Sequence, residues 1–420
     1  MKFPTQATSV GDQPRFGIRP NLGQFMLLVA VNGLVGALIG QERALVPLFG
    51  TRIFALQSTT TILLFIVTFG IAKAASNLVA GALADRIGRK RILIAGWGIG
   101  LPVPVLLMIA PSWGWVVAAN ILLGINQGLT WSITVVMKID LAGPRRRGFA
   151  MGVNEFSGYL AVGLSAAASG ALAARYGLRP EPLFLGLAIA AVGLGVSGLL
   201  VKETSGHAEL ENDGAPPKPF REVARLTSFG DPRLASISRT GLVNNANDAH
   251  AWGLLPLLLA GQGLSTAHIG VVAAAYPIAW GIGQLFTGGL SDQIGRRIPI
   301  AGGMWIQASA LFGLALTEGL AGGVTFAVLL GIGTALTYPA LLAAVGDVAA
   351  PGWRATAIGV YRTWRDGGYV IGALAAGVFA DLFDLRIALG VIAAATALSG
   401  LDAWIHLRGD SSRDDLSSVG

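Results

Sequence analysis

Ionisable side chains occur inside long apolar segments of this chain. The segment GLVNNANDAHAWGLL holds Asp248 and His250, and the segment GVYRTWRDGGY holds Arg362, Arg365 and Asp366. A charge at the centre of a bilayer costs about 2.5–3.5 kcal/mol on insertion scales, so such residues are usually kept for a partner or a function. If these segments cross a membrane, their chemistry is reversible protonation or ion binding rather than covalent catalysis.

Asp248 is the first candidate for a proton-coupling group, because a carboxylate removed from water can load and release a proton. His250 follows two residues later and belongs to a residue type that titrates near physiological pH. Side chains at i and i+2 do not share a helix face, so no direct relay within the helix is expected. Glu155 and Asp366 are further proton-coupling candidates. The alternative for Asp248 and His250 is a polar patch that neighbouring helices satisfy.

Four charges are candidates for pairing inside the membrane. Lys73 precedes Asp85 by twelve residues, about 18 Å of helix, and Asp366 lies at a similar depth, so the two are expected to form an ion pair. Arg365 instead suits an anionic substrate, because guanidinium groups favour two-pronged contacts with carboxylate or phosphate. Arg362 is expected to pair with Glu155 or to extend toward the membrane surface. Static structural pairing is the alternative for all four.

The composition places these charges in a membrane protein. Among 420 residues, Lys and Arg number 30 and Asp and Glu 23, so only 13% are charged, against about 25% in soluble domains. Hydrophobic residues make up 53%, and mean hydropathy is +0.63. Disorder, a fibrous repeat, a secreted disulfide scaffold and an ordinary cytosolic enzyme are excluded. The formal charge of +7 is explained by basic loops, so no nucleic-acid partner is expected, and the absence of Cys removes thiol chemistry.

Twelve apolar runs are long enough to cross a bilayer, and no cleavable signal peptide precedes them. They are predicted near residues 22–46, 57–84, 91–110, 114–138, 149–174, 183–201, 236–260, 266–290, 298–317, 322–345, 356–380 and 387–406. The more basic loops lie on one side of these spans, which predicts that both termini are cytoplasmic. The predicted divisions are a tail at 1–21, a half at 22–201, a linker at 202–235, a half at 236–406 and a tail at 407–420. A short amphipathic helix is predicted around 220–226.

The two halves repeat each other at an interval of 207 residues. Residues 71–90 and 278–297 align without a gap, with nine of twenty positions identical. The same interval maps Asp140 onto Asp347 and Arg147 onto Arg354 in a second loop. Two loops in register indicate that both halves of six spans point the same way through the membrane.

One repeated loop carries a motif, Gly81-x-x-x-Asp85-Arg86-x-Gly88-Arg89-Lys90, followed in the second half by Gly288-x-x-x-Asp292-Gln293-x-Gly295-Arg296-Arg297. It resembles the signature between helices 2 and 3 of the major facilitator superfamily of secondary transporters, as found in bacteria. The resemblance implies an all-α membrane protein with twelve helices in two parallel six-helix halves. It also implies alternating access, with the motif acting as a cytoplasmic latch between the halves.

In that family, helices 1, 4, 7 and 10 line the central cavity. The resemblance makes the following residues candidates for the substrate cavity: Asn32, Asn126, Gln127, Trp131, Asn244, Asn245, Asp248 and Tyr338. Arg365 of span eleven is a further cavity candidate, because its guanidinium suits an anionic substrate. Trp131 and Tyr338 are one repeat interval apart, so they are expected to form an aromatic pair across the site. The alternative for both is ordinary core packing.

The expected function is proton-coupled transport of a small solute, with export preferred. The alternatives are uptake of an anionic solute with protons and, in another class, a non-transporting membrane sensor. Span five lacks the Gly-Pro motif typical of drug antiporters, so no motif fixes the substrate. No P-loop or His-Glu-x-x-His motif occurs, and the four His are scattered, so neither an enzyme, a cofactor nor a metal site is expected. A monomer in the inner (plasma) membrane is expected, with lipid and solute as partners.

Overall fold

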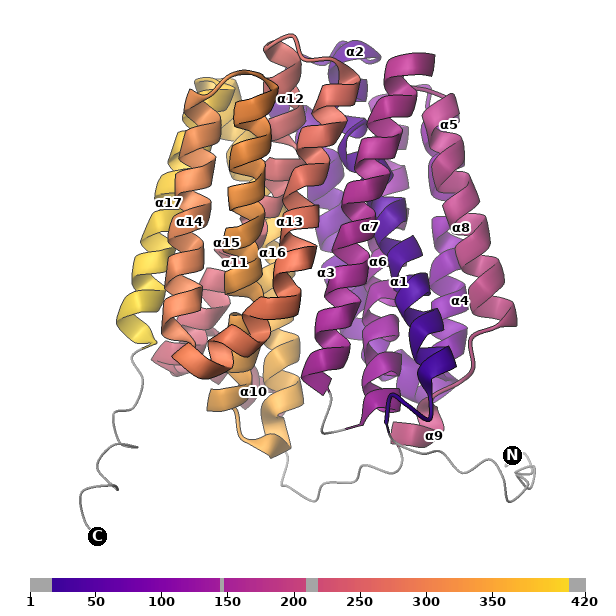
Figure 1. The fold of residues 1–420 in the computed structure, drawn as a ribbon, viewed down its shortest axis with the longest axis vertical. Helices are drawn as coiled ribbons and strands as arrows, with labels where there is room; N and C mark the ends of the chain where they lie inside the picture. Colours follow the sequence, from indigo (N-terminus) through magenta and orange to yellow (C-terminus); the bar gives the residue numbers. More distant parts are fainter. Residues whose placement is uncertain (1–16, 144–146, 209–217, 408–420) are drawn as a thin grey trace.

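The computed structural model describes residues 17–143, 147–208 and 218–407, and these residues form a bundle of long helices (Figure 1). The helices of the first half are α1 Leu22–Arg43, α2 Val46–Arg52, α3 Thr59–Ile87, α4 Arg89–Gly100, α5 Pro102–Ile109, α6 Trp113–Ala142, α7 Arg147–Tyr176 and α8 Glu181–Leu199. Between the halves lie α9 Ser205–Ala208, α10 Phe220–Arg225 and a π-helical turn, Leu226–Gly230. The helices of the second half are α11 Pro232–Trp252, α12 Leu254–Gly261, α13 Thr266–Ile294, α14 Arg297–Leu316, α15 Gly319–Val348, α16 Pro351–Leu382 and α17 Leu385–His406.

Nine stretches of the described chain are long and apolar enough to cross a membrane by length and composition. Three predicted spans are not among them. The apolar part of α8 covers only Leu183–Leu199, and α11–α12 and α16 carry the polar and charged residues that the sequence placed in their centres. The predicted runs 22–46, 91–110 and 236–260 are each broken into two consecutive helices, at Ala44–Leu45, Leu101 and Gly253.

The two halves repeat the same close helix contacts. Gly124 of α6 lies so close to α3 that an added Cβ would come within 2.5 Å of the Phe69 carbonyl oxygen. Gly331 of α15, one repeat interval later, lies in the same way against α13 at the Tyr276 carbonyl and at Trp280 N. The sequence repeat is therefore also a repeat of helix packing, because both halves need a residue without a side chain at this crossing.

The halves meet along two helix pairs, α3 with α16 and α7 with α13. In the first pair, Gly70 lies against Tyr369 and Gly377 against Thr60. In the second pair, Gly170 and Gly270 approach each other closely enough that a Cβ on either would meet the backbone of the other. Small residues thus bring the backbones of the two halves together toward one end of the bundle.

That end, which holds α2 and α12 at the top of Figure 1, is closed. Asp381 of α16 accepts hydrogen bonds from Ser58 Oγ at 2.8 Å and from the amide of Thr60 at 3.0 Å, at the start of α3. Below this contact the buried Arg43 guanidinium of α1 lies 4.5 Å from the ring centre of Phe69 and 4.9 Å from that of Trp252. This end is called the closed end below.

The other end, which holds the repeated loop motifs, is called the loop-motif end. A groove of about 510 Å³ runs there between α7, α13, α15 and α16. Glu155 and Tyr338 lie deep in its lining, and Asp292 and Arg296 lie where α13 ends. The structure is therefore closed at one end of the bundle and grooved at the other.

Replacing Gly331 by Ala is predicted to destabilise the second half by about 1–3 kcal/mol, because the new Cβ must displace α13 backbone. Gly302→Ala on α14 is the control, since nothing lies within 4 Å of its Cβ position. Thermal unfolding of the purified variants measures the difference. Equal melting temperatures for the two variants would contradict the close contact.

Candidate transport site

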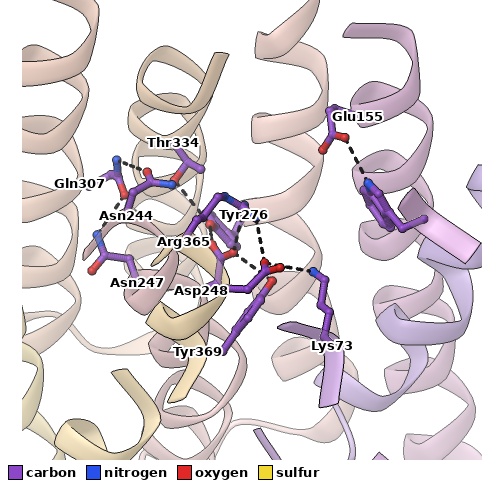
Figure 2. Close-up of polar contacts among 12 residues, drawn as sticks. Lys73, Glu155, Asn244, Asn247, Asp248, Tyr276, Gln307, Thr334, Arg365 and Tyr369 are labelled. Carbon is purple, nitrogen blue, oxygen red and sulfur yellow. Dashed lines mark hydrogen bonds and ion pairs between the residues drawn. The ribbon is translucent and has the colours of Figure 1, made fainter. Parts of the chain in front are cut away.

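Asp248 of α11 is fully buried near the middle of the bundle and is held by two tyrosines (Figure 2). One carboxylate oxygen accepts a hydrogen bond from Tyr276 Oη of α13, and the other accepts one from Tyr369 Oη of α16 at 3.3 Å. The Arg365 guanidinium lies 3.9 Å from the second oxygen. The carboxylate thus has two neutral hydroxyl groups as hydrogen-bond partners, and its counter-charge lies slightly farther away. It therefore keeps hydrogen-bond partners whether or not it carries a proton.

Arg365 of α16 connects Asp248 with a second carboxylate. Its Nη1 atom lies 3.7 Å from Asp366 Oδ1, and its guanidinium carbon lies 4.3 Å from the ring centre of Tyr338. Nε and Nη2 have no hydrogen-bond partner among the described residues, although the side chain is buried. An arginine held by charge and by an aromatic face, with unused donors, can change partners or accept an anion.

Lys73 and Asp366 meet across the two halves. Lys73 Nζ of α3 lies 3.9 Å from Asp366 Oδ1 of α16, and it also lies 5.0 Å from the ring centre of Tyr369. Asn77, one turn along α3, donates a hydrogen bond of 2.5 Å to the other Asp366 oxygen. The structure places the pair where depth matching predicted it, and it adds Asn77, which the sequence did not single out.

Glu155 of α7 accepts hydrogen bonds from two uncharged donors. Trp131 Nε1 donates to Glu155 Oε1 at 3.1 Å, and Asn154 Nδ2 donates to the same oxygen at 3.0 Å. Glu155 lines a small cavity of about 30 Å³, which has room for about one water. Arg362, the partner of Glu155 expected from the sequence, lines the same cavity. The space around this small cavity, called the central chamber below, is nearly filled by side chains in this conformation. Glu155 and Tyr338 also line the larger groove at the loop-motif end.

A row of aromatic rings crosses from one half to the other. Trp131 and Tyr159 have ring centres 5.2 Å apart, Tyr159 stacks on Trp280 at 3.4 Å, and Trp280 meets Tyr338 edge-on at 6.0 Å. Trp131 and Tyr338, the pair predicted from the repeat, are the two ends of this row rather than direct neighbours. The bridging rings, Tyr159 and Trp280, are not among the residues predicted from the sequence, and Trp280 is the repeat equivalent of Lys73.

Several polar cavity candidates lie in helix contacts instead. In the first half, Asn32 donates to the Asn154 carbonyl at 2.7 Å, Asn126 to the Gly96 carbonyl at 2.8 Å, and Gln127 to the Val35 carbonyl at 3.0 Å. These three side chains are fully buried, and the cavities described above are lined by others. They therefore join helices within their own half rather than facing a solute.

The asparagines of α11 also point into the second half. Asn244 accepts a hydrogen bond from Gln307 of α14 at 3.0 Å, and Asn247 donates one to Gln307 at 3.0 Å (Figure 2). Asn245 is buried where α11 crosses Gly368 of α16. His250 is buried too, and its Nδ1 has no hydrogen-bond partner among the described residues. Asp248, Arg365, Asp366 and Lys73 are called the charged cluster below. Of the polar residues predicted as candidates on α11, Asp248 is the one within this cluster.

The repeated loop motifs pair their charges within each half. Arg89 forms an ion pair with Asp140 at 2.6 Å, and Arg296 forms one with Asp347 at 2.8 Å, one repeat interval later. Arg296 also contacts Asp292 at 2.6 Å. Gly88 and Gly295 have positive φ angles of 96° and 80°, which explains the glycine in the turn of each motif.

The remaining motif residues add little to a latch in this conformation. Arg86 is exposed, Lys90 and Arg297 lie in the first turn of the helix after the motif, and Gly288 lines the larger groove. The side chain of Asp85 and the surroundings of Gly81 lie outside the described residues. The described motif charges thus hold each loop to its own half, and the latch between halves stays a prediction for another state.

Glu203, just after the first half, holds the start of α4. Its carboxylate accepts hydrogen bonds from the amides of Arg89 at 3.1 Å and Lys90 at 3.0 Å, and from those of Thr204 and Ser205. Burial opposes ionisation, but these four hydrogen bonds outweigh it and hold the pKa of Glu203 below its usual value. The linker is therefore docked on the loop motif of the first half.

The fold and the charged cluster define a class: a helical membrane transporter whose two halves enclose a buried, titratable site. Comparison with known proteins gives the family. The family model of the Major Facilitator Superfamily matches residues 22–240 and 237–418. The chain therefore belongs to the major facilitator superfamily, and it is a multi-pass inner-membrane secondary transporter, not an enzyme.

Individual relatives are distant. The multidrug resistance protein MdtG of Salmonella heidelberg is 26% identical over 82% of this chain and 85% of its own. The inner membrane transport protein YnfM of Escherichia coli is 27% identical over 36% of each chain, so this chain spans about a third of its length. The crystal structure of a bacterial homologue of the human lysosomal transporter Spinster superposes with a TM-score of 0.73 at 15% identity, covering 92% of this chain and 97% of that one.

The Lys73–Asp366 contact is predicted to appear in a double-mutant cycle. Lys73→Met and Asp366→Asn should each lower stability, and the double variant should lose less than their sum, with a coupling of about 0.5–3 kcal/mol, because each single change removes an opposite charge from a residue that stays buried. Thermal unfolding measures all four proteins. The exposed pair Arg239–Asp402 is the control, for which coupling below about 1 kcal/mol is expected. Additive losses at Lys73 and Asp366 would contradict the contact.

The docking of Glu203 is predicted to depend on pH. Because its pKa is lowered in the folded protein, its stabilisation is present above the usual carboxyl range and is lost as the pH falls through the lowered value. Glu203→Gln should therefore lower the melting temperature at pH 7, and the difference from wild type should shrink on acidification. Glu181→Gln, at an exposed position of the closed end, is the control. A difference that does not change with pH would contradict the assignment.

Proposed function

We propose that this chain is a proton-coupled exporter that moves a small solute by alternating access. In this proposal it crosses the membrane twelve times, both termini are cytoplasmic, and it works as a monomer. The proton gradient supplies the energy in place of a bound cofactor. The basic loop motifs support the orientation, because positively charged loops stay in the cytoplasm.

The observation that carries the proposal is a line of four charges from the buried carboxylate to the boundary between the halves. Asp248 lies 3.9 Å from Arg365, Arg365 lies 3.7 Å from Asp366, and Asp366 lies 3.9 Å from Lys73 of the first half. A proton that neutralises Asp248 weakens the attraction between Asp248 and Arg365. Arg365 then competes with Lys73 for Asp366, so the proton alters a contact between the halves.

Alternating access follows if that contact differs between two states. The described conformation is closed at the Asp381–Thr60 contact and grooved at the loop-motif end, so in this proposal it is the inward-facing state. Coupling requires that the proton and the solute each favour one of the two states. The solute's place is the chamber between Trp131, Glu155 and Arg365, which must enlarge when the halves move.

Export is the favoured direction because MdtG, which matches four fifths of this chain, is named for multidrug resistance. Uptake of an anionic solute with protons is the second candidate. It is favoured by Arg365, whose Nε and Nη2 atoms have no hydrogen-bond partner among the described residues. An anion bound to Arg365 would take the place of Asp248 as its counter-charge, and Asp248 would then carry the proton.

Vesicles with an imposed pH gradient test coupling and direction together. The solutes are chosen from lipophilic cations, organic anions, sugars and metal oxyanions by their stabilisation of the purified protein. A proton antiporter should concentrate its solute in the acidic compartment, and a symporter in the alkaline one. Asp248→Asn should still exchange labelled solute across the membrane but should lose gradient-driven accumulation, because position 248 can no longer carry a proton.

His250→Gln is the comparison variant on the same helix and should retain gradient-driven accumulation, since His250 lies outside the charged cluster. Accumulation that survives in Asp248→Asn would move the coupling to Glu155 or Asp366. Solute exchange in neither wild type nor variant, for a solute that stabilises both proteins, would contradict transport of that solute.

A further inference from the structure

Two aromatic rings from different halves stack on each other beside the central chamber. Tyr159 of α7 and Trp280 of α13 have ring centres 3.4 Å apart and ring planes that differ by 28°. Both side chains are buried, and Tyr159 lines the chamber. The stack depends on a close approach of the two helices, since a Cβ added to Gly281 of α13 would lie 3.4 Å from the Tyr159 Cβ. Movement of the halves apart at this crossing therefore separates the two rings.

Each ring keeps neighbours in its own half when the stack opens. Tyr159 contacts Trp131 of α6, with ring centres 5.2 Å apart. Trp280 contacts Tyr338 of α15 at 6.0 Å and Tyr276 of α13 at 5.7 Å between ring centres. These contacts position the two separated rings on opposite sides of the boundary between the halves. A flat ring placed between them restores the stacking that both lose, because an aromatic ring is stabilised by offset stacking on another.

Hydrogen-bond donors without an acceptor lie next to this stack. Arg365 Nε and Nη2 and Trp280 Nε1 are buried, and none of them has a hydrogen-bond partner among the described residues. The Arg365 guanidinium carbon lies 4.3 Å from the ring centre of Tyr338 and 6.0 Å from that of Trp280, so these donors lie near one another. A buried donor that makes no hydrogen bond destabilises the protein. The chamber therefore suits a solute that brings an oxygen acceptor.

We propose that the transported solute is a flat aromatic compound with a carbonyl or carboxylate oxygen attached to its ring. The ring lies between Tyr159 and Trp280 once the halves have moved, and the oxygen accepts hydrogen bonds from Arg365. A saturated ring of the same size has no flat aromatic face and binds more weakly. This inference rests on the proposed function only in placing the solute in the central chamber, and it requires neither proton coupling nor export.

The test compares three neutral probes on the full chain, purified in a neutral detergent. Naphthalene carboxamide has a flat ring and an oxygen acceptor. Decahydronaphthalene carboxamide keeps the oxygen but has a saturated ring, and methylnaphthalene keeps the flat ring but lacks the oxygen. Isothermal titration calorimetry measures binding, with the detergent alone as the blank. Naphthalene carboxamide should bind roughly fivefold more tightly than either of the others, which corresponds to about 1 kcal/mol for the stacking or for the hydrogen bond.

Variants assign the binding to this site. Tyr159→Leu should weaken the binding of naphthalene carboxamide roughly fivefold, whereas Tyr159→Phe, which keeps the ring, should bind it like the wild-type protein. Tyr176→Leu is the control on the same helix and should change nothing, because that ring is exposed at the end of α7. Arg365→Lys keeps the charge but loses the forked donors, so it should weaken the binding of naphthalene carboxamide and leave that of methylnaphthalene unchanged.

Naphthalene carboxamide that binds no more tightly than either of the other probes overturns the proposal. Equal affinities of Tyr159→Leu and Tyr159→Phe also overturn it, because the stack is then core packing that no solute enters. Melting temperatures of the proteins without probe check that the variants fold. If Tyr159→Leu does not fold, Arg365→Lys decides, and an unchanged affinity of that variant for naphthalene carboxamide overturns the proposal.

Failure of this inference differs from failure of the proposed function, because the titrations use no gradient. If naphthalene carboxamide binds as expected but no solute moves with the pH gradient in vesicles, the aromatic site stands and the proton-coupled exporter fails. If a solute is driven by the gradient and its affinity is the same in Tyr159→Leu and Tyr159→Phe, the exporter stands and the aromatic site fails.

Discussion

The central constraint on this structure is that charges removed from water must have partners. Asp248, Arg365, Asp366 and Lys73 are all buried, and each lies within 4 Å of an opposite charge in the cluster. The contacts of 3.7–3.9 Å are longer than direct hydrogen bonds, so the partners are held near one another without being locked. Two of the four residues are neighbours on α16, the second-half helix that packs against α3. A change in the charge of Asp248 therefore acts on α16, the second-half helix at the boundary between the two halves.

The rest of the bundle restricts how that helix can move. At the closed end, Asp381 joins α16 to the start of α3, and the Arg43 guanidinium fills the space between Phe69 and Trp252. At the loop-motif end, Arg89 and Arg296 are each paired within their own half. The two halves are thus internally rigid at the motif loops and joined at one end, which is the arrangement that rocking about a mid-membrane site requires.

Much of the architecture could be predicted from the sequence, because apolar length, loop charge and the interval of 207 residues are properties of the chain. Depth along a helix also predicted the Lys73–Asp366 neighbours. Rotation about the helix axis could not be predicted in this way. Asn32 and Asn244 lie at suitable depths but turn toward backbone and amide partners in their own half, whereas Tyr276 and Tyr369, which look like core aromatics in the sequence, hold Asp248. Which face a polar residue occupies depends on neighbouring helices that a single sequence does not place.

The most direct test of the account is whether the charge of Asp248 sets the balance between the two states. The chain has no Cys, so spin labels can be attached to introduced cysteines at exposed positions, Ile87 with Gln293 at the loop-motif end and Arg175 with Leu382 at the closed end. Distances across both ends are measured by pulsed electron resonance between pH 5 and 8. The account predicts that the two distance distributions change with pH in opposite directions and that Asp248→Asn removes the change. The same pH response in Asp248→Asn would contradict it.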